Sequence, residues 1–215
     1  MGRSYGQYCG LARALDVVGD RWNLLIVRQL LVAPARYQEL RDGLPGVATN
    51  LLVDRLRDLE AAGVIERRLA KEGRAITYAL TPWGAQLREP IESLIRWSTP
   101  LMIRGPEGDV FPAGGLLVSL PALLGGRVPK GRPVTVGIVV NGDTPRVQVR
   151  ATRSGIEVSP RDDRELDAVL SADVQIVLGL AAGVLALDDV LGVVGIQGDD
   201  AAVRAIFGAP VNTAA

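Results

Sequence analysis

The sequence predicts an α+β protein in two parts, which we place at residues 1–104 and 115–210. Three observations lead to this prediction. In the first half, apolar residues at helical spacing are followed by two short alternating stretches typical of a hairpin. Residues 104–114 are rich in glycine and proline, which is typical of a domain boundary. Beyond them, short strand-like and helix-like stretches interleave, which favours an α+β domain with a mainly antiparallel sheet.

The composition excludes several classes of site. Of the 215 residues, 48% are hydrophobic and only 4% are aromatic, so we expect aliphatic cores. The chain has no histidine and a single cysteine, Cys9, which argues against imidazole catalysis, histidine or cysteine metal sites and an internal disulfide. We therefore expect no enzyme, metal or cofactor. No signal peptide or membrane-spanning run is recognisable, so we expect a cytoplasmic protein without a membrane partner.

The net charge of zero conceals an asymmetry between the two parts. Residues 1–105 carry 15 Arg and Lys against 11 Asp and Glu, whereas the rest carry 9 against 13. A basic front and an acidic back favour a nucleic-acid-binding part joined to a part that does not contact phosphate.

Three helices are expected before residue 47, over 9–18, 23–31 and 37–41. Leu11, Leu15 and Val18 recur at helical spacing in the first. Asp20 or Asn23 is expected to cap the second, which ends before a proline.

A longer helix is expected over 47–62, where Leu52, Leu56 and Leu59 share one face. Thr49 is a plausible N-cap, and Gly63 is a plausible C′ residue with positive φ.

Two strands are expected next, over 64–69 and 75–80, around a turn at 71–74. A helix followed by a hairpin with a basic tip is typical of a winged helix-turn-helix. In that fold, recognition helix 47–62 would enter the major groove and wing 64–80 would lie on the phosphates of double-stranded DNA.

The candidate DNA-binding residues follow from this arrangement. Arg57 is expected to pair with guanine and Asn50 with adenine. Asp54 would either accept from cytosine or only hold Arg57 or Arg55. The candidates for base contact are Thr49, Asn50, Val53, Asp54 and Arg57. The candidates for phosphate contact are Arg21, Arg36, Tyr37 and Gln38 near helix starts, with Arg67, Arg68, Lys71 and Arg74 in the wing. The alternative is a solvated helix face and an ordinary polar hairpin.

After the hairpin, Thr81 is expected to cap a helix that runs to about residue 95 or 103, with Pro82 at its first position. Pro90 would kink or break it. Its apolar stripe has two interpretations, packing on its own domain or a dimer interface.

In the second half, the pattern predicts helices over 116–124, 164–170, 180–191 and 199–207, the last capped by Asp199 or Asp200. Strands are predicted over 134–140, 146–150, 155–159, 174–178 and 193–197, with a hairpin turn at 141–143.

Residues 9 to about 100 resemble the HxlR-type winged-helix transcriptional regulators of bacteria. The matching words are Cys9, ALDVVGDRW (14–22), LLIVRQLL (24–31), YQELRDGLPGV (37–47), NLLVDRLRDLEAAGVIERR (50–68) and YALTPWG (78–84). Gly10 departs from the family, which usually has proline there. Some members use the equivalent cysteine to sense oxidants, which implies a possible redox sensor at Cys9. The alternative is that Cys9 is a small buried hydrophobe.

Residues 116–207 more weakly resemble sterol-carrier-protein-2-like domains, through ADVQIVLGLAAGVLALDDVL (172–191) and VVGIQGDDAAVRAIF (193–207). Those domains enclose an apolar cavity, so the resemblance implies a ligand or interaction domain. It names no ligand-binding residues.

These observations favour a DNA-binding transcriptional regulator that acts as a homodimer and whose C-terminal domain senses a small apolar ligand or supports the dimer. One alternative is a redox-responsive regulator that switches through Cys9. Another is a lipid- or metabolite-binding protein whose winged helix contacts protein. The operator, the regulated genes, the direction of regulation, the ligand and the dimerising domain do not follow from the sequence.

Overall fold

The computed structural model describes residues 4–69, 75–102, 104–112, 114–129, 131–140, 142 and 144–208. The chain divides into two compact units, which we describe separately. Unit 1 comprises the chain up to Ile91 together with Pro112–Gly115, and unit 2 comprises the remainder. The turns expected at 71–74 and 141–143 lie wholly or partly outside the described residues.

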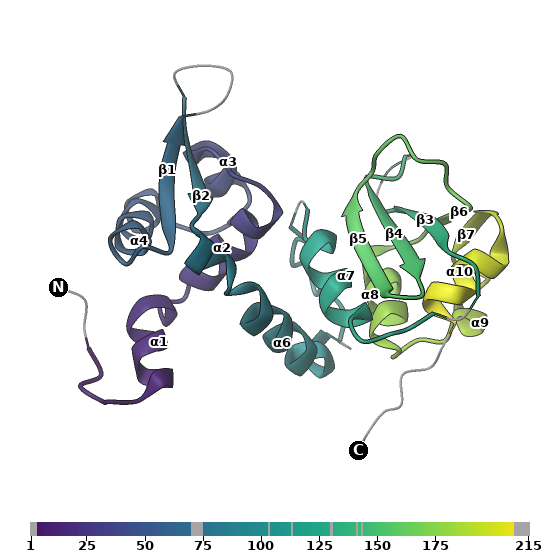
Figure 1. The fold of residues 1–215 in the computed structure, drawn as a ribbon, viewed down its shortest axis with the longest axis horizontal. Helices are drawn as coiled ribbons and strands as arrows, with labels where there is room; N and C mark the ends of the chain where they lie inside the picture. The colour runs from purple at the N-terminus through teal and green to yellow at the C-terminus, as the bar shows by residue number, and fades with distance from the viewer. Residues whose placement is uncertain are drawn as a thin grey trace. The chain divides into compact units, whose positions relative to one another are not determined.

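Unit 1 has the expected order of helices followed by a hairpin (Figure 1). Leucines at positions 52, 56 and 59 are buried, as the helical period predicts. Strands β1 and β2 pair antiparallel, with Ile65 opposite Leu80. The elements are α1 (Gly10–Val18), α2 (Asn23–Val32), α3 (Tyr37–Asp42), α4 (Thr49–Ala61), β1 (Ile65–Leu69), β2 (Ile76–Leu80) and α5 (Pro82–Ala85).

Two expected helix caps are wrong. Ala48 occupies the N-cap of α4 and Thr49 is already helical, so no side chain caps this helix. Trp22 occupies the N-cap of α2, again without a side-chain cap. Asn23 is almost fully buried, and its Nδ2 donates to the carbonyl of Val17 at 2.8 Å. That bond ties α2 to the end of α1, and it directs the Asn23 amide toward α1 instead of the first N–H groups of α2.

The apolar face of α1 is only partly buried. Val18 packs inward, but Leu11 is 69% exposed and Leu15 is 39% exposed. The helical spacing of these residues is therefore real, although the stripe is not covered within the described chain.

The expected kink at Pro90 is wrong in position. Helix α5 ends at Ala85, and a new helix, α6 (Arg88–Ser98), begins three residues later and leads into a 3₁₀ turn, η1 (Thr99–Met102). Pro90 falls in the first turn of α6, where a backbone N–H has no intrahelical acceptor, so the ring is tolerated. The Thr81 cap is confirmed, because its Oγ1 accepts from the N–H of Gly84 at 3.0 Å.

Within its described residues, unit 2 contains a five-stranded sheet in the order β5-β4-β3-β6-β7. Only β3 and β6 pair in parallel among these strands, so the mainly antiparallel sheet is confirmed. The elements are α7 (Leu116–Leu124), β3 (Val134–Val139), β4 (Val147–Thr152), β5 (Gly155–Pro160), β6 (Ala168–Ser171), α8 (Val174–Ala182), α9 (Leu187–Val190), β7 (Gly195–Gly198) and α10 (Asp200–Phe207).

Three predicted elements of this unit are wrong. The helix expected over 164–170 is a loop that runs into β6, because Ala168 and Leu170 pair with β3. The strand expected over 174–178 is the first part of α8, whose apolar residues pack inward. The helix expected over 180–191 is interrupted at Gly183, which adopts a φ of 71° and separates α8 from α9.

Strand β3 is buried along its whole length. Val136 and Ile138 belong to the aliphatic core that α7, α8 and α10 complete. On the opposite face, Gly137 lies under Leu166 and Pro145, and a Cβ there would approach Leu166 to 2.7 Å. This close cover explains why a central strand carries glycine.

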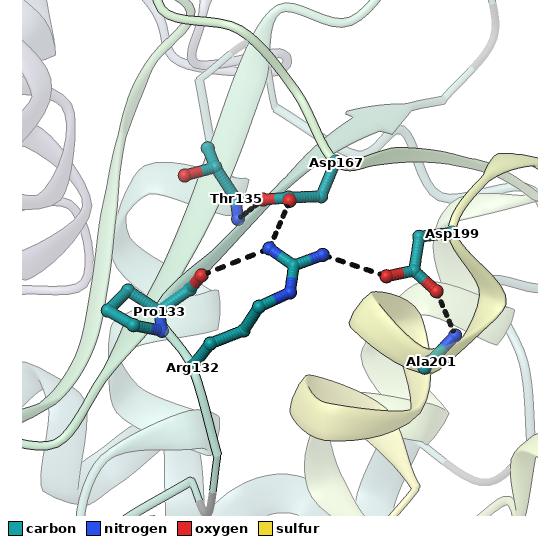
Figure 2. A network of polar contacts seen from close by, with 6 residues as sticks. All are labelled: Arg132, Pro133, Thr135, Asp167, Asp199 and Ala201. Carbon is teal, nitrogen blue, oxygen red and sulfur yellow. Dashed lines mark hydrogen bonds and ion pairs between the residues drawn. The ribbon is translucent and has the colours of Figure 1, made fainter.

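Arg132 joins the starts of three elements of unit 2 (Figure 2). Its guanidinium donates to Asp167 at 2.6 Å and to Asp199 at 2.9 Å, and Asp199 also accepts from the N–H of Ala201 as the cap of α10. Burial alone would raise the pKa of Asp167, but hydrogen bonds from Arg132 and from the N–H of Thr135 hold that pKa below its ordinary value. The network is structural, and the predicted Asp199 cap is confirmed.

Candidate nucleic-acid interface

Helices α3 and α4 form a helix-turn-helix whose connection is held by a hydrogen bond, two buried leucines and a glycine turn. The hydroxyl of Tyr37 donates to the carbonyl of Thr49 at 3.2 Å, which ties the start of α3 to the start of α4. Leu40 of α3 and Leu44 of the connection are fully buried. Gly46 takes a φ of 85° in the turn, a conformation that other residues rarely adopt. In this structure the hydroxyl of Tyr37 therefore serves to join two helices. A phosphate contact for Tyr37 stays a prediction.

All five predicted base-contact residues of α4 are exposed. They are Thr49, Asn50, Asp54, Arg57 and Val53, whose exposed fraction is 40%. Among the described residues, the Asn50 side chain has no hydrogen-bond partner, whereas Asp54 accepts from Arg57 at 3.2 Å. In the free protein Asp54 therefore holds Arg57 rather than Arg55, and acceptance from a cytosine stays a prediction.

The two wing arginines that the structure describes, Arg67 and Arg68, are paired rather than free. Arg67 donates to Glu60 of α4 at 2.7 Å, and Arg68 donates through Nε to Glu66 at 2.6 Å. The hydrogen bond and charge of Glu60 raise the pKa of Arg67 above its ordinary value. Because successive residues of a strand point to opposite faces, Arg67 and Arg68 cannot both face one phosphate row. Lys71 and Arg74 lie outside the described residues.

The remaining predicted phosphate contacts surround the helix starts. Arg21 is exposed before α2 with its guanidinium over the Trp22 ring, 5.7 Å from the ring centroid. Arg36 is exposed at the N-cap of α3, where its own N–H donates to Glu39 at 2.6 Å. Gln38 is exposed but donates to Asp42 at 2.8 Å. The structure thus brings these groups to the surface without testing their contacts.

Cys9 is exposed at the N-cap of α1, so the interpretation of this residue as a buried hydrophobe is wrong. The backbone N–H groups of Ala12 and Leu11, in the first turn of the helix, lower the pKa of its thiol. The helix N-terminus supplies this effect because its amides favour a negative charge. The sequence could not show that Cys9 is exposed, because its burial depends on which residues pack against α1.

One residue that the sequence analysis did not assign is Arg55 of α4. Its side chain is only 18% exposed and forms ion pairs with Asp20 and with Asp58. The only hint in the sequence was its position on the helix. The helical period places Arg55 at the edge of the leucine face, where a charged side chain is unusual.

Other kinds of site find no support in the described part of the chain. No group of three or more Cys, Asp or Glu side chains there could hold a metal ion. Among the described helices, none combines the length and apolar character needed to cross a bilayer.

Known proteins resemble the first half of the chain. The family model described as HxlR-like helix-turn-helix matches residues 17–104. The uncharacterized HTH-type transcriptional regulator YvaP of Bacillus subtilis is 35% identical over 88 residues, which are 40% of this chain and 82% of YvaP. The HTH-type transcriptional regulator YodB of the same organism is 30% identical over 86 residues, 40% of this chain and 77% of YodB.

The match to the solved structure of the reduced form of YodB from Bacillus subtilis covers 46% of this chain and 99% of the YodB chain. The identity is 28% and the TM-score is 0.40. The family match ends at residue 104, so the sterol-carrier-like resemblance of residues 116–207 stays a prediction. Since the chain covers more than four-fifths of YvaP at 35% identity, it belongs to the HxlR-like helix-turn-helix family.

Proposed function

We propose that this protein is a DNA-binding transcriptional regulator that acts as a homodimer in the cytoplasm, where its DNA is accessible. The observation that carries the proposal is the exposed face of α4, which presents Asn50, Val53 and Arg57 on the second helix of a helix-turn-helix. That helix is the one that enters the major groove in this class of fold. The relatives YvaP and YodB bear the name of transcriptional regulators, which supports the same function.

In the proposed complex, Arg57 pairs with guanine and Asn50 with adenine. The wing contributes phosphate contacts, for which Arg67 and Arg68, on opposite faces of β1, exchange their carboxylate partners for phosphates of different rows. Both arginine side chains are more than half exposed, and ion pairs of exposed side chains contribute little net stability, so the exchange is inexpensive.

The test begins with selection of a preferred sequence from a pool of random DNA duplexes, followed by titration at two salt concentrations. We expect one sequence family, termed the selected duplex below, to bind tightly and with strong salt dependence. Arg57→Ala combined with Asn50→Ala should abolish this specific binding. Arg13→Ala is the charge-matched control, because Arg13 is an exposed arginine of α1 paired only with Asp16 at 3.5 Å among the described residues. Recovery of no sequence would instead favour a winged helix that contacts protein.

The homodimer is supported by apolar side chains that the described chain leaves uncovered. On α6 and η1, Leu94, Trp97, Leu101 and Met102 are exposed, Trp97 by 75%. Trp97→Asp is expected to shift the protein from dimer to monomer in sedimentation experiments. Val110→Asp is the matched control, because Val110 is equally exposed but lies outside α6. An unchanged dimer in Trp97→Asp would place the interface elsewhere.

For unit 2 we propose binding of a small apolar ligand that changes the affinity for DNA. The support is the aliphatic core that α7, α8 and α10 build on the sheet, together with the sterol-carrier-like resemblance. Fold resemblance does not define a ligand. Nuclear magnetic resonance titration with medium-chain fatty acids should shift resonances of unit 2 and alter the affinity for the selected duplex. Resonance shifts without a change in DNA affinity would argue against regulation.

A second candidate function is redox control through Cys9, favoured by its exposure and its lowered thiol pKa. Hydrogen peroxide is expected to oxidise the thiolate to sulfenic acid and to change the affinity for the selected duplex. Cys9→Ser should bind DNA as the wild type does but lose the response to peroxide. A response that persists in Cys9→Ser would exclude this function.

A further inference from the structure

Arg55 belongs to the recognition helix but does not share the exposed face of Asn50 and Arg57. It lies three residues after Leu52 and directly before Leu56, at the edge of the buried face. Its side chain is 18% exposed, compared with 71% for Arg57. Its Nε is buried and has no hydrogen-bond partner within the described chain. The Arg55 guanidinium therefore does not lie on the helix face that is proposed to contact the bases.

The guanidinium of Arg55 forms ion pairs with two carboxylates of different kinds. Asp58 lies on α4 itself, 3.2 Å away, so this pair cannot fix the helix relative to another element. Asp20 lies in the turn between α1 and α2, and α1 packs against α4. The Asp20–Arg55 pair therefore connects the recognition helix to the rest of the unit.

The turn that carries Asp20 is itself held firmly. Gly19 closes α1 by donating to the carbonyl of Leu15 at 2.9 Å, and the carbonyl of Asp20 accepts from the N–H of Asn23 at 3.0 Å. The buried Asn23 side chain donates to Val17 at 2.8 Å. A Cβ on Gly19 would collide with the Leu15 carbonyl at 2.4 Å, so the chain fits closely there. Asp20 is thus presented to α4 from a fixed position.

We propose that the Asp20–Arg55 ion pair sets the position of the recognition helix against the α1–α2 turn, and that Arg55 is a positioning residue for DNA binding rather than a base-reading one. The inference rests on the proposed function. Removing Asp20 would leave a poorly solvated cation at the edge of the core with Asp58, on α4 itself, as its remaining partner among the described residues, which is unfavourable. Movement of that edge of α4 toward water would solvate the Arg55 guanidinium. The same movement would carry Asn50 and Arg57 away from their bases.

The chain provides a matched pair of variants to test this. Asp20→Asn and Asp58→Asn each remove one carboxylate from Arg55 and one negative charge from unit 1, but only the first breaks a link to another element. Affinities are measured for the selected duplex and for a scrambled duplex of the same length. Asp20→Glu and Arg55→Lys keep the charges and serve as conservative variants.

We expect Asp20→Asn to weaken binding of the selected duplex by about tenfold, in the range of couplings carried by contacts remote from a ligand. Binding of the scrambled duplex should stay unchanged or strengthen slightly, since a negative charge is lost. Asp58→Asn should remain within about twofold of the wild type, and Asp20→Glu should recover part of the loss. Equal effects of the two Asn variants, or none, would overturn the proposal.

Hydrogen exchange of the full chain without DNA provides a second, independent measurement. Asp20→Asn should lose protection at the amides of α4 while those of β1, β2 and unit 2 keep theirs, and Asp58→Asn should match the wild type. If Asp20→Asn unfolds, Arg55→Lys is measured in its place and should show a weaker form of the same pattern. If the wild type binds no duplex, the proposed function fails and this measurement alone decides. Unchanged protection of α4 would then overturn the link.

Discussion

Asp54→Asn provides a direct test of how the exposed face of α4 contacts DNA. In the free protein Asp54 holds Arg57 at 3.2 Å, and both side chains are more than half exposed. At that separation two unit charges attract by about 1.3 kcal/mol in bulk water. Ordering of the two side chains reduces the net contribution to roughly 0.2–1 kcal/mol. Releasing Arg57 to a base should therefore strengthen specific binding by about 1.5- to 5-fold.

The assay is fluorescence anisotropy of the selected duplex at several salt concentrations. Asp54→Asn should gain affinity at every salt concentration, because it frees Arg57 and removes a charge that phosphates repel. The alternative is that Asp54 accepts from a cytosine, in which case the variant loses affinity and relaxes its preference at one base pair. Asp163→Asn is the control, since Asp163 is an exposed aspartate of unit 2 and its variant loses the same charge. The reasoning is refuted if the Asp54→Asn titrations coincide with those of the wild type while Arg57→Ala still weakens binding.

Three further predictions follow from features of the fold. Thr81→Ala should lower the free energy of unfolding by about 1 kcal/mol, because the N–H of Gly84 loses its cap; thermal denaturation measures this, and an unchanged Tm would contradict it. The rate of iodoacetamide labelling of Cys9 should reach its half-maximum at a pH below that of free cysteine, because its pKa is lowered; a higher midpoint would show that the helix amides do not act on it. Asp167 has a lowered pKa when folded, so its ion pair with Arg132 stabilises above the unfolded-state pKa and the contribution disappears as the pH falls through the folded-state pKa. Asp167→Asn should thus be less stable near neutrality and less sensitive to acid, which urea unfolding across pH can check; a parallel acid dependence in both proteins would argue against this role.

The parts of the fold that the sequence predicted well are those decided by neighbouring residues. Thr81 and Pro82 start a helix through chemistry that lies within one turn. Gly63 ends α4 with a φ of 75°, as the lack of a Cβ allows. The inward face of α4 follows from the period of its leucines alone.

The parts that failed depend on distant partners. Residues 174–178 are rich in β-branched side chains and were expected to form a strand, yet they form the start of α8 because the helix buries Val177 and Leu180 against the sheet. Residues 164–170 have helical spacing, but Ala168 and Leu170 complete the pairing of β3, some thirty residues earlier. Local propensity is a weak guide where a long-range strand partner is available.

The candidate interface divides in the same way. The outward positions of Asn50 and Arg57 follow from helical geometry, and the structure places both residues there. The partner of Arg67 does not follow from helical geometry. Glu60 belongs to the preceding helix and approaches Arg67 only when the hairpin folds back on that helix. Arg55 was missed for the same reason, since Asp20 lies far from it in the sequence.

The parallel pairing of β3 with β6 also constrains the order in which the chain folds. The hairpin partner of β3 follows it closely, but its other neighbour, β6, is synthesised only after β5 and residues 161–167. Pairings between distant segments form slowly, whereas the hairpin of unit 1 closes locally. On the ribosome, the N-terminal helix-turn-helix would therefore be formed while the C-terminal sheet still lacks one side. For that interval the unpaired flank of β3 would be open to pairing with another molecule.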